Sequence, residues 1–70
     1  MSRLSKAIGK RIAKERKKQL ISQESLSDLA DLNVSYLGEV ERGEYSVGVD
    51  TLQKITKALK ISLEDLFKGL

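Results

Sequence analysis

The chain has 70 residues, a formal net charge of +3, and neither cysteine nor histidine. This length permits one compact domain with a small core, and the missing residue types argue against disulfides, the common zinc sites and imidazole catalysis. No apolar run approaches the roughly 18 residues that a membrane span needs, so we expect a soluble intracellular protein.

The charge is distributed unevenly along the chain. Residues 1–18 carry eight lysine or arginine residues against one acidic residue, whereas residues 19–53 carry seven acidic residues against one arginine. Residues 54–70 carry four lysines and two acidic residues. A basic segment of this density favours a polyanion partner, most simply nucleic acid. The alternative interpretation is an ordinary solvated helix face.

The first predicted helix covers residues 4–18. Its apolar residues Leu4, Ile8 and Ile12 recur every four positions and form one stripe among basic residues. Gly9 in the helix interior costs close to 1 kcal/mol relative to alanine. We therefore expect another helix to approach closely at Gly9.

Residues 23–43 predict two short helices joined by a tight turn. The first covers residues 23–30, with Leu26, Leu29 and Ala30 on one face, and the second covers residues 34–41. Only residues 31–33 separate them, so the helices must cross steeply, as in a helix-turn-helix unit. An ordinary αα-hairpin is the alternative that this spacing leaves open.

Polar residues and glycine mark the ends of these two helices. Ser22 and Asn33 are good N-caps for them, and Gly43 is typical of a C-terminal cap. Asp31 suits a left-handed conformation in the turn, because aspartate tolerates it better than most residues.

The remaining chain predicts two more helices. Residues 50–59 form the fourth, with a stripe of apolar residues that begins one position earlier, at Val49, Leu52, Ile55 and Leu59. Ser62 followed by Asp65 is typical of a capping box with the shorter acid, and it opens a short fifth helix through Leu63, Leu66 and Phe67. The predicted fold class is therefore all-α, with five helices in one domain that spans residues 1–70.

Two stretches of this sequence resemble a known family. SQESLSDLADLNVSYLGEVERGE, followed by VDTLQKITKALKISLEDLF, is similar to the helix-turn-helix domains of the Cro and phage-repressor type, also called Xre-like. Residues 43–49 resemble those of the small controller proteins of restriction-modification systems. The resemblance implies a compact, lambda-repressor-like domain in which the second and third helices form the helix-turn-helix. The glycines that the family usually has after the first helix and in the turn are Leu20 and Asp31 here.

The resemblance also implies roles for individual residues. The third helix would enter the major groove, and the positions that match base-facing ones are Asn33, Val34, Ser35, Gly38 and Glu39. Gln23, a further candidate for a base contact, would lie at the start of the second helix near a phosphate or a base edge. For Asn33, capping alone is the alternative. The candidates for phosphate contacts are Tyr36, Arg42 and Ser46, together with Lys10 and Arg11 of the basic first helix. Arg16 and Glu41 match residues that form an ion pair in the family.

The resulting functional prediction is a sequence-specific regulator of transcription that binds double-stranded DNA. We expect the protein to bind a partly palindromic operator as a homodimer. We also expect it in the cytoplasm of a bacterium, encoded by the bacterium, a phage or a plasmid. The candidate dimer surface contains Leu63, Phe67 and Leu70, although Phe67 alternatively closes the core of a monomer.

The competing prediction is a protein-interaction module, such as an antirepressor or assembly domain, that keeps the fold and binds a partner through its acidic middle. We expect no enzymatic activity, because the sequence has no nucleophile and base constellation and no phosphate loop. We also expect no cofactor, metal or small-molecule ligand.

Overall fold

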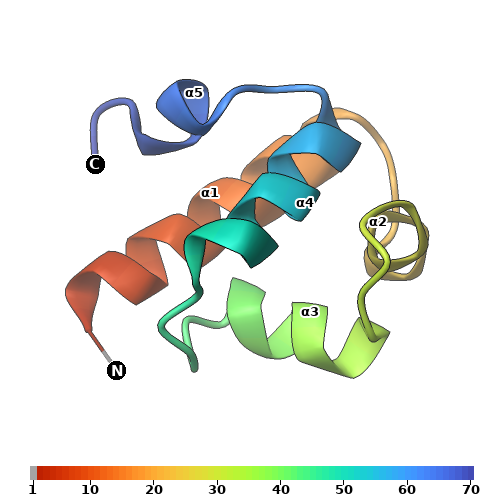
Figure 1. The fold of residues 1–70 in the computed structure, drawn as a ribbon, viewed down its shortest axis with the longest axis horizontal. Coiled ribbons are helices and arrows are strands. Elements are labelled where there is room, and N and C mark those ends of the chain that lie inside the picture. The colour runs from red at the N-terminus through yellow and green to blue at the C-terminus, as the bar shows by residue number, and fades with distance from the viewer. Residues whose placement is uncertain (1) are drawn as a thin grey trace.

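The computed structural model describes residues 2–70, and these form five helices without a strand. The helices are α1 (Arg3–Lys18), α2 (Gln23–Leu29), α3 (Val34–Glu41), α4 (Val49–Leu59) and α5 (Leu63–Phe67). Helices α1 and α4 lie side by side in the middle of the molecule, with α3 and α5 on opposite sides of this pair (Figure 1). The predicted all-α fold with five helices is confirmed. None of the helices in residues 2–70 combines the length and the apolarity that crossing a membrane requires.

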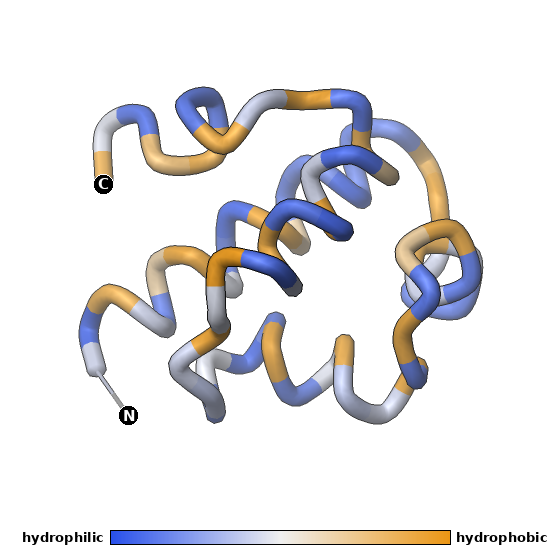
Figure 2. Tube along the Cα trace, viewed as in Figure 1, coloured by the Kyte–Doolittle hydropathy of each residue, from blue (hydrophilic) through white to orange (hydrophobic). Residues whose placement is uncertain are grey.

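All of these helices contribute to one apolar core. Hydrophobic positions recur along each helix (Figure 2), and one side of each helix faces the centre. Complete burial of a leucine or isoleucine side chain contributes about 1.5–3 kcal/mol relative to its exposure. The buried apolar residues are Ile8, Ile12, Leu26, Ala30, Leu37, Val40, Leu52, Ile55, Leu59 and Leu66.

Three apolar residues that the sequence placed on buried stripes are exposed instead. Leu4, Leu29 and Val49 expose 54%, 64% and 65% of their surfaces. Each lies in the first or last turn of its helix, where the chain already leaves the core. The helix ends also differ slightly from prediction, since α1 begins at Arg3, α2 ends at Leu29 and α4 begins at Val49.

Side-chain caps begin α2 and α3 as predicted. The Ser22 hydroxyl oxygen accepts the backbone N–H of Ser25 at 3.0 Å. The Asn33 side-chain oxygen accepts the backbone N–H of Ser35 at 2.8 Å. These bonds satisfy N–H groups that have no partner within the helix.

The turn between α2 and α3 depends on a left-handed residue. Asp31 has φ +57°, as expected for an aspartate in this corner, and the N–H of Leu32 donates to the Ser27 carbonyl at 2.8 Å. Leu32 packs against the core from the turn. Ser27 is 2% exposed, and its small side chain lets α3 pass close to α2. Figure 1 shows the resulting steep crossing, with α2 viewed almost end-on and α3 lengthwise.

Both ends of the five-residue helix α5 are fixed by polar contacts. The Ser62 hydroxyl accepts the N–H of Asp65 at 2.9 Å, and the Asp65 carboxylate accepts the N–H of Ser62 at 3.2 Å. The bond from the Ser62 backbone holds the pKa of Asp65 below its usual value. At the other end, the Arg11 guanidinium donates to the carbonyls of Asp65 and Leu66 at 3.1 and 3.3 Å. The Arg11 side chain, predicted to contact a phosphate, thus anchors α5 through one of its guanidinium nitrogens.

At Gly9, α1 lies directly against the backbone of α3. A Cβ atom at position 9 would lie 2.5 Å from the carbonyl oxygen of Glu41, which belongs to the backbone of α3. The predicted close approach of another helix at Gly9 is thus confirmed, and that helix is α3.

The two glycines in helix interiors should respond oppositely to alanine. Gly9→Ala should cost about 1–3 kcal/mol of unfolding free energy, because the added methyl meets backbone atoms that cannot rotate away. Gly38→Ala should gain up to about 1 kcal/mol from helix propensity, since its Cβ would crowd the mobile end of Arg42, at 3.2 Å, and would touch the Gln23 amide at an ordinary contact distance of 3.7 Å. Urea denaturation measures both, and a Gly9→Ala variant as stable as the parent would contradict the packing described.

Candidate nucleic-acid interface

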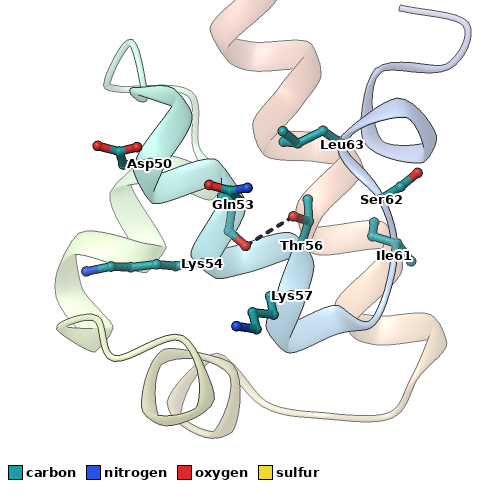
Figure 3. Close-up of a pocket in the computed structure, with 8 residues that line it drawn as sticks. All are labelled: Asp50, Gln53, Lys54, Thr56, Lys57, Ile61, Ser62 and Leu63. Carbon is teal, nitrogen blue, oxygen red and sulfur yellow. Dashed lines mark hydrogen bonds between the residues drawn. The ribbon is translucent and has the colours of Figure 1, made fainter.

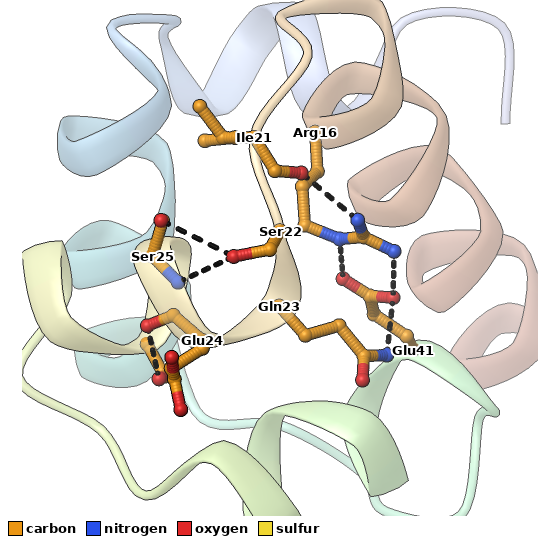
Figure 4. Close-up of polar contacts among 8 residues, drawn as sticks. Arg16, Ile21, Ser22, Gln23, Glu24, Ser25 and Glu41 are labelled. Carbon is orange, nitrogen blue, oxygen red and sulfur yellow. Dashed lines mark hydrogen bonds and ion pairs between the residues drawn. The ribbon is translucent and has the colours of Figure 1, made fainter.

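A nearly buried ion pair joins α1 to the end of α3. The Arg16 guanidinium donates from Nε to Glu41 Oε2 at 2.8 Å and from Nη2 to Glu41 Oε1 at 3.0 Å. Arg16 and Glu41 are only 8% and 9% exposed. A third guanidinium nitrogen donates to the Ile21 carbonyl at 3.0 Å, so the pair also holds the connection between α1 and α2 (Figure 4). The hydrogen bond to Glu41 raises the pKa of Arg16.

The same carboxylate fixes Gln23 at the start of α2. The Gln23 amide nitrogen donates to Glu41 Oε1 at 2.9 Å. An ionised carboxylate can only accept hydrogen bonds, so the amide nitrogen has to face Glu41. Figure 4 shows the Gln23 side chain reaching from α2 toward Glu41, with its oxygen directed away from the carboxylate.

Gln23 borders a shallow hollow on the exposed side of α2 and α3. Gly38 lies at this hollow, and a Cβ there would be 3.7 Å from the Gln23 side-chain oxygen. Because Gly38 has no side chain, the ends of Gln23 and Arg42 can approach each other. The residues that line the hollow are Gln23, Val34, Ser35, Gly38, Glu39 and Arg42.

The hollow brings together five of the six candidates for base contacts. Val34 is 40% exposed, Ser35 is exposed and Glu39 is half-buried. Asn33, the sixth candidate, lies just before α3, and its side-chain oxygen is occupied by the capping bonds to Ser35 and Tyr36. Only the amide nitrogen of Asn33 remains for another partner.

The charge around the hollow is mixed. Arg42 Nε donates to Glu44 Oε2 at 2.6 Å, and this bond raises the pKa of Arg42. Both side chains are largely exposed, so the pair contributes little to stability. It does hold the guanidinium beside the hollow, where Glu39 supplies a second negative charge.

The other candidates for phosphate contacts lie around this surface. The ring of Tyr36 packs against that of Tyr45, with centroids 5.6 Å apart and planes tilted by 41°. Ser46 is exposed in the loop between α3 and α4. Lys10 is exposed on α1 and does not line the hollow. It belongs to a set of exposed basic residues on α1 that we call the α1 basic surface, namely Arg3, Lys6, Lys10, Lys14 and Lys17.

The candidate dimer residues lie elsewhere, on and around α5. Leu63 packs partly against the core and lines a wider, open hollow beside α4. Lys54 and Lys57 of α4 also line this hollow, and their side chains extend away from Leu63 (Figure 3). Phe67 and Leu70 are 39% and 47% exposed, whereas Leu66 is fully buried. Leu66, rather than Phe67, therefore closes the core at α5, and Phe67 stays available on the surface.

The match to a family model decides between the two predicted arrangements of α2 and α3. A model described as helix-turn-helix matches residues 12–66. The chain belongs to the helix-turn-helix family, of the Cro and phage-repressor type that its sequence resembles. In this family member, α2 and α3 form the helix-turn-helix.

Control proteins of restriction-modification systems are among its relatives. The chain is 41% identical over 49 residues to the control protein C.BamHI of Bacillus amyloliquefaciens, and the match covers 70% of this chain and 60% of that protein. The chain thus spans less than two thirds of the length of C.BamHI.

Solved structures of controller proteins share the whole fold. The restriction-modification controller protein C.AhdI from Aeromonas hydrophila has a TM-score of 0.91 and 35% sequence identity, over 94% of this chain and all of that one. C.Esp1396I bound to a 25 base pair operator site has a TM-score of 0.89 and 26% identity, over 97% of this helix-turn-helix chain and 90% of that one.

Sequence reasoning missed the polar partners of the candidate residues. The contact of Gln23 with Glu41 joins residues 18 positions apart, and no local pattern signals it. Glu44 was likewise not expected to pair with Arg42. The contact between the Tyr36 and Tyr45 rings joins α3 to the loop that follows it, and no local pattern predicted it.

Removal of one partner of the buried ion pair should destabilise the protein strongly. Arg16→Met leaves the Glu41 carboxylate buried without its cation, which should cost about 3–5 kcal/mol of unfolding free energy. Arg16→Met combined with Glu41→Met should recover most of that loss, because no unpaired charge remains. The matched control is Lys18→Met, because the Lys18 side chain is 75% exposed and lies 3.7 Å from its partner Glu15, with an expected loss below about 1 kcal/mol. Thermal denaturation tests all three, and equal losses for Arg16→Met and Lys18→Met would contradict the role of the buried pair.

Proposed function

We propose that this chain is a transcriptional regulator that binds double-stranded DNA sequence-specifically, as a homodimer on an operator. The observation that carries this proposal is the hollow on the exposed side of α2 and α3, where most of the candidate base contacts meet. An α-helix fits the major groove of B-DNA, where each base pair presents a distinct pattern of donors and acceptors. The names of the relatives agree with this role, since they include control proteins and a phage immunity repressor.

Polar groups around the hollow suit the reading of base edges. Ser35 can donate or accept, Glu39 can accept from a cytosine amino group, and Val34 can pack against a thymine methyl. Arg42 at the rim can contact a phosphate while Glu44 holds its guanidinium in place. The hollow is too small and too mixed in charge to bind DNA tightly by itself, so affinity requires additional phosphate contacts.

The α1 basic surface is the proposed source of that affinity. Lys6 lies against Gly43, two residues after the end of α3, so this surface reaches the end of the recognition helix. Phosphate contacts by lysine and arginine release counterions and supply much of the affinity for DNA. None of the basic residues in this set forms an ion pair among the contacts of residues 2–70.

Self-association through the surface around α5 completes the proposal. Helix α5 lies apart from α3 (Figure 1), so α3 stays free for DNA when α5 contacts a second copy. The Cα positions extend 26 × 22 × 21 Å, and two such molecules side by side can place their recognition helices one turn of DNA apart, roughly 34 Å. The exposed apolar side chains of Phe67 and Leu70 supply the contact surface.

A change of two side chains at the hollow should alter which operator is preferred. Ser35→Ala combined with Glu39→Ala removes a donor and an acceptor that face the bases, and each lost base contact changes discrimination by about 1–3 kcal/mol. Competition binding against a panel of operator variants measures the preference. A uniform loss of affinity across all sequences would contradict the base-reading role of Ser35 and Glu39.

Charge reversal on the α1 basic surface should weaken binding to every sequence. Lys6→Glu with Lys10→Glu removes two cations beside α3, and the slope of log affinity against log salt should fall by about 2 units. Lys57→Glu with Lys68→Glu is the control, since it makes the same change in net charge on α4 and after α5.

Titrations of duplex DNA at several salt concentrations compare these two pairs of substitutions. An equal change of slope for both would assign the effect to net charge rather than to the α1 basic surface. Absence of any duplex binding by the unmodified protein at low salt would contradict the regulator and favour a protein-interaction module.

A further inference from the structure

We propose that Glu41 is a positioning residue that makes Gln23 present a hydrogen-bond acceptor to DNA, so that this position of the operator selects an amino base over a keto base. This inference rests on the proposed function of the helix-turn-helix. It assigns a cause for specificity to a residue that lies behind the DNA-facing surface and touches no base.

The contact with Glu41 sets the orientation of the Gln23 amide. A glutamine side chain is free to rotate its amide by half a turn, which exchanges a donor for an acceptor. Here one end of the amide lies 2.9 Å from Glu41 Oε1. A carboxylate that is ionised has no hydrogen to donate, so only the orientation with the amide nitrogen toward Glu41 forms a bond.

The Glu41 carboxylate cannot turn away from Gln23, because Arg16 holds it. Both of its carboxylate oxygens accept from the Arg16 guanidinium, at 2.8 and 3.0 Å, in a bidentate pair. Such pairs are geometrically restrictive as well as strong. Arg16 is in turn bound to the Ile21 carbonyl, two residues before Gln23. The acceptor for the Gln23 amide is therefore fixed to the same segment of chain that carries Gln23.

The Gln23 amide borders the hollow that Ser35 and Glu39 also line. A Cβ at Gly38 would lie 3.7 Å from the amide oxygen and 3.8 Å from the amide nitrogen. Because the nitrogen is bound to Glu41, the oxygen is the atom that remains free at this hollow. An acceptor at this place pairs with a donor on the base edge. In the major groove these donors are the amino groups of adenine and cytosine, whereas guanine and thymine present acceptors there.

The expected result is a base preference at one position of each half-site. The unmodified protein should prefer adenine or cytosine over guanine or thymine on the contacted strand at that position, by about tenfold, as expected for one good contact. Gln23→Met keeps the length of the side chain without its polar atoms. The position that Gln23 reads is the one at which Gln23→Met removes the preference.

The decisive variant is Glu41→Gln. An amide at residue 41 can accept or donate, so the Gln23 amide is free to take both orientations. The amino-over-keto preference should fall from about tenfold to about onefold at that position and stay unchanged at the others. The measurement is the relative affinity for duplexes that carry each of the four bases at each position of the half-site.

A matched variant separates positioning from stability. Arg16→Lys replaces the bidentate pair by a bond from a single ammonium group. That bond still holds the Glu41 carboxylate on the side of α1, so the carboxylate still accepts from Gln23. This variant should lose stability in thermal denaturation and keep the base preference. In Glu41→Gln the buried Arg16 guanidinium has no carboxylate partner, which can prevent folding. In that case Arg16→Met combined with Glu41→Gln removes the unpaired guanidinium, and this double variant should show the same loss of the amino-over-keto preference.

Three outcomes would overturn the assignment. These are a preference for guanine or thymine at the Gln23 position, a full preference retained when residue 41 is glutamine, and a preference lost equally in Arg16→Lys. Each of them requires that the unmodified protein still discriminates among sequences. Failure of the proposed function gives a different result, since the unmodified protein would then bind no sequence selectively.

Discussion

The ion pair between Arg16 and Glu41 is the interaction on which the rest of this structure depends. It joins α1 to the end of α3, and its third donor holds the chain between α1 and α2 through the Ile21 carbonyl. Within residues 2–70, no buried side-chain nitrogen or oxygen lacks a hydrogen-bond partner. A buried charge is tolerated only with such complete pairing, so the recognition helix and the start of α2 are held in one geometry relative to α1.

This constraint links the core to the surface that faces DNA. Gly9 lets α1 lie directly against the backbone of α3, which brings Arg16 within reach of Glu41. Glu41 then orients Gln23 at the hollow. The packing at Gly9 thus positions the ion pair, and the ion pair positions the side chain that faces DNA. A loose connection at any step would leave the base-facing groups without a fixed direction.

Local signals predicted the helices well, because caps and periodicity act within a few residues. Ser22, Asn33 and the pair of Ser62 and Asp65 began helices where expected. Periodicity failed for Leu29, which follows the apolar spacing yet lies at the end of its helix, beyond the reach of the core. The contact of Arg11 with α5 could not be foreseen, since it joins residues more than 50 positions apart. The family resemblance named all six residues that line the hollow. Neither the resemblance nor any local pattern predicted the orientation of the Gln23 amide, because that orientation follows from a tertiary contact.

Selection of binding sites from random duplex DNA tests the central claim most directly, namely that the exposed edge of α2 and α3 reads a DNA sequence. The account predicts an enriched motif made of two inverted half-sites, with centres about one helical turn or roughly 10 base pairs apart. It also predicts that the same motif is enriched when substitutions outside α1, such as Lys57→Glu with Lys68→Glu, lower the net charge. The reason is that base contacts rather than net charge specify the sequence. A pool that shows no enriched sequence after selection at low salt would contradict the account.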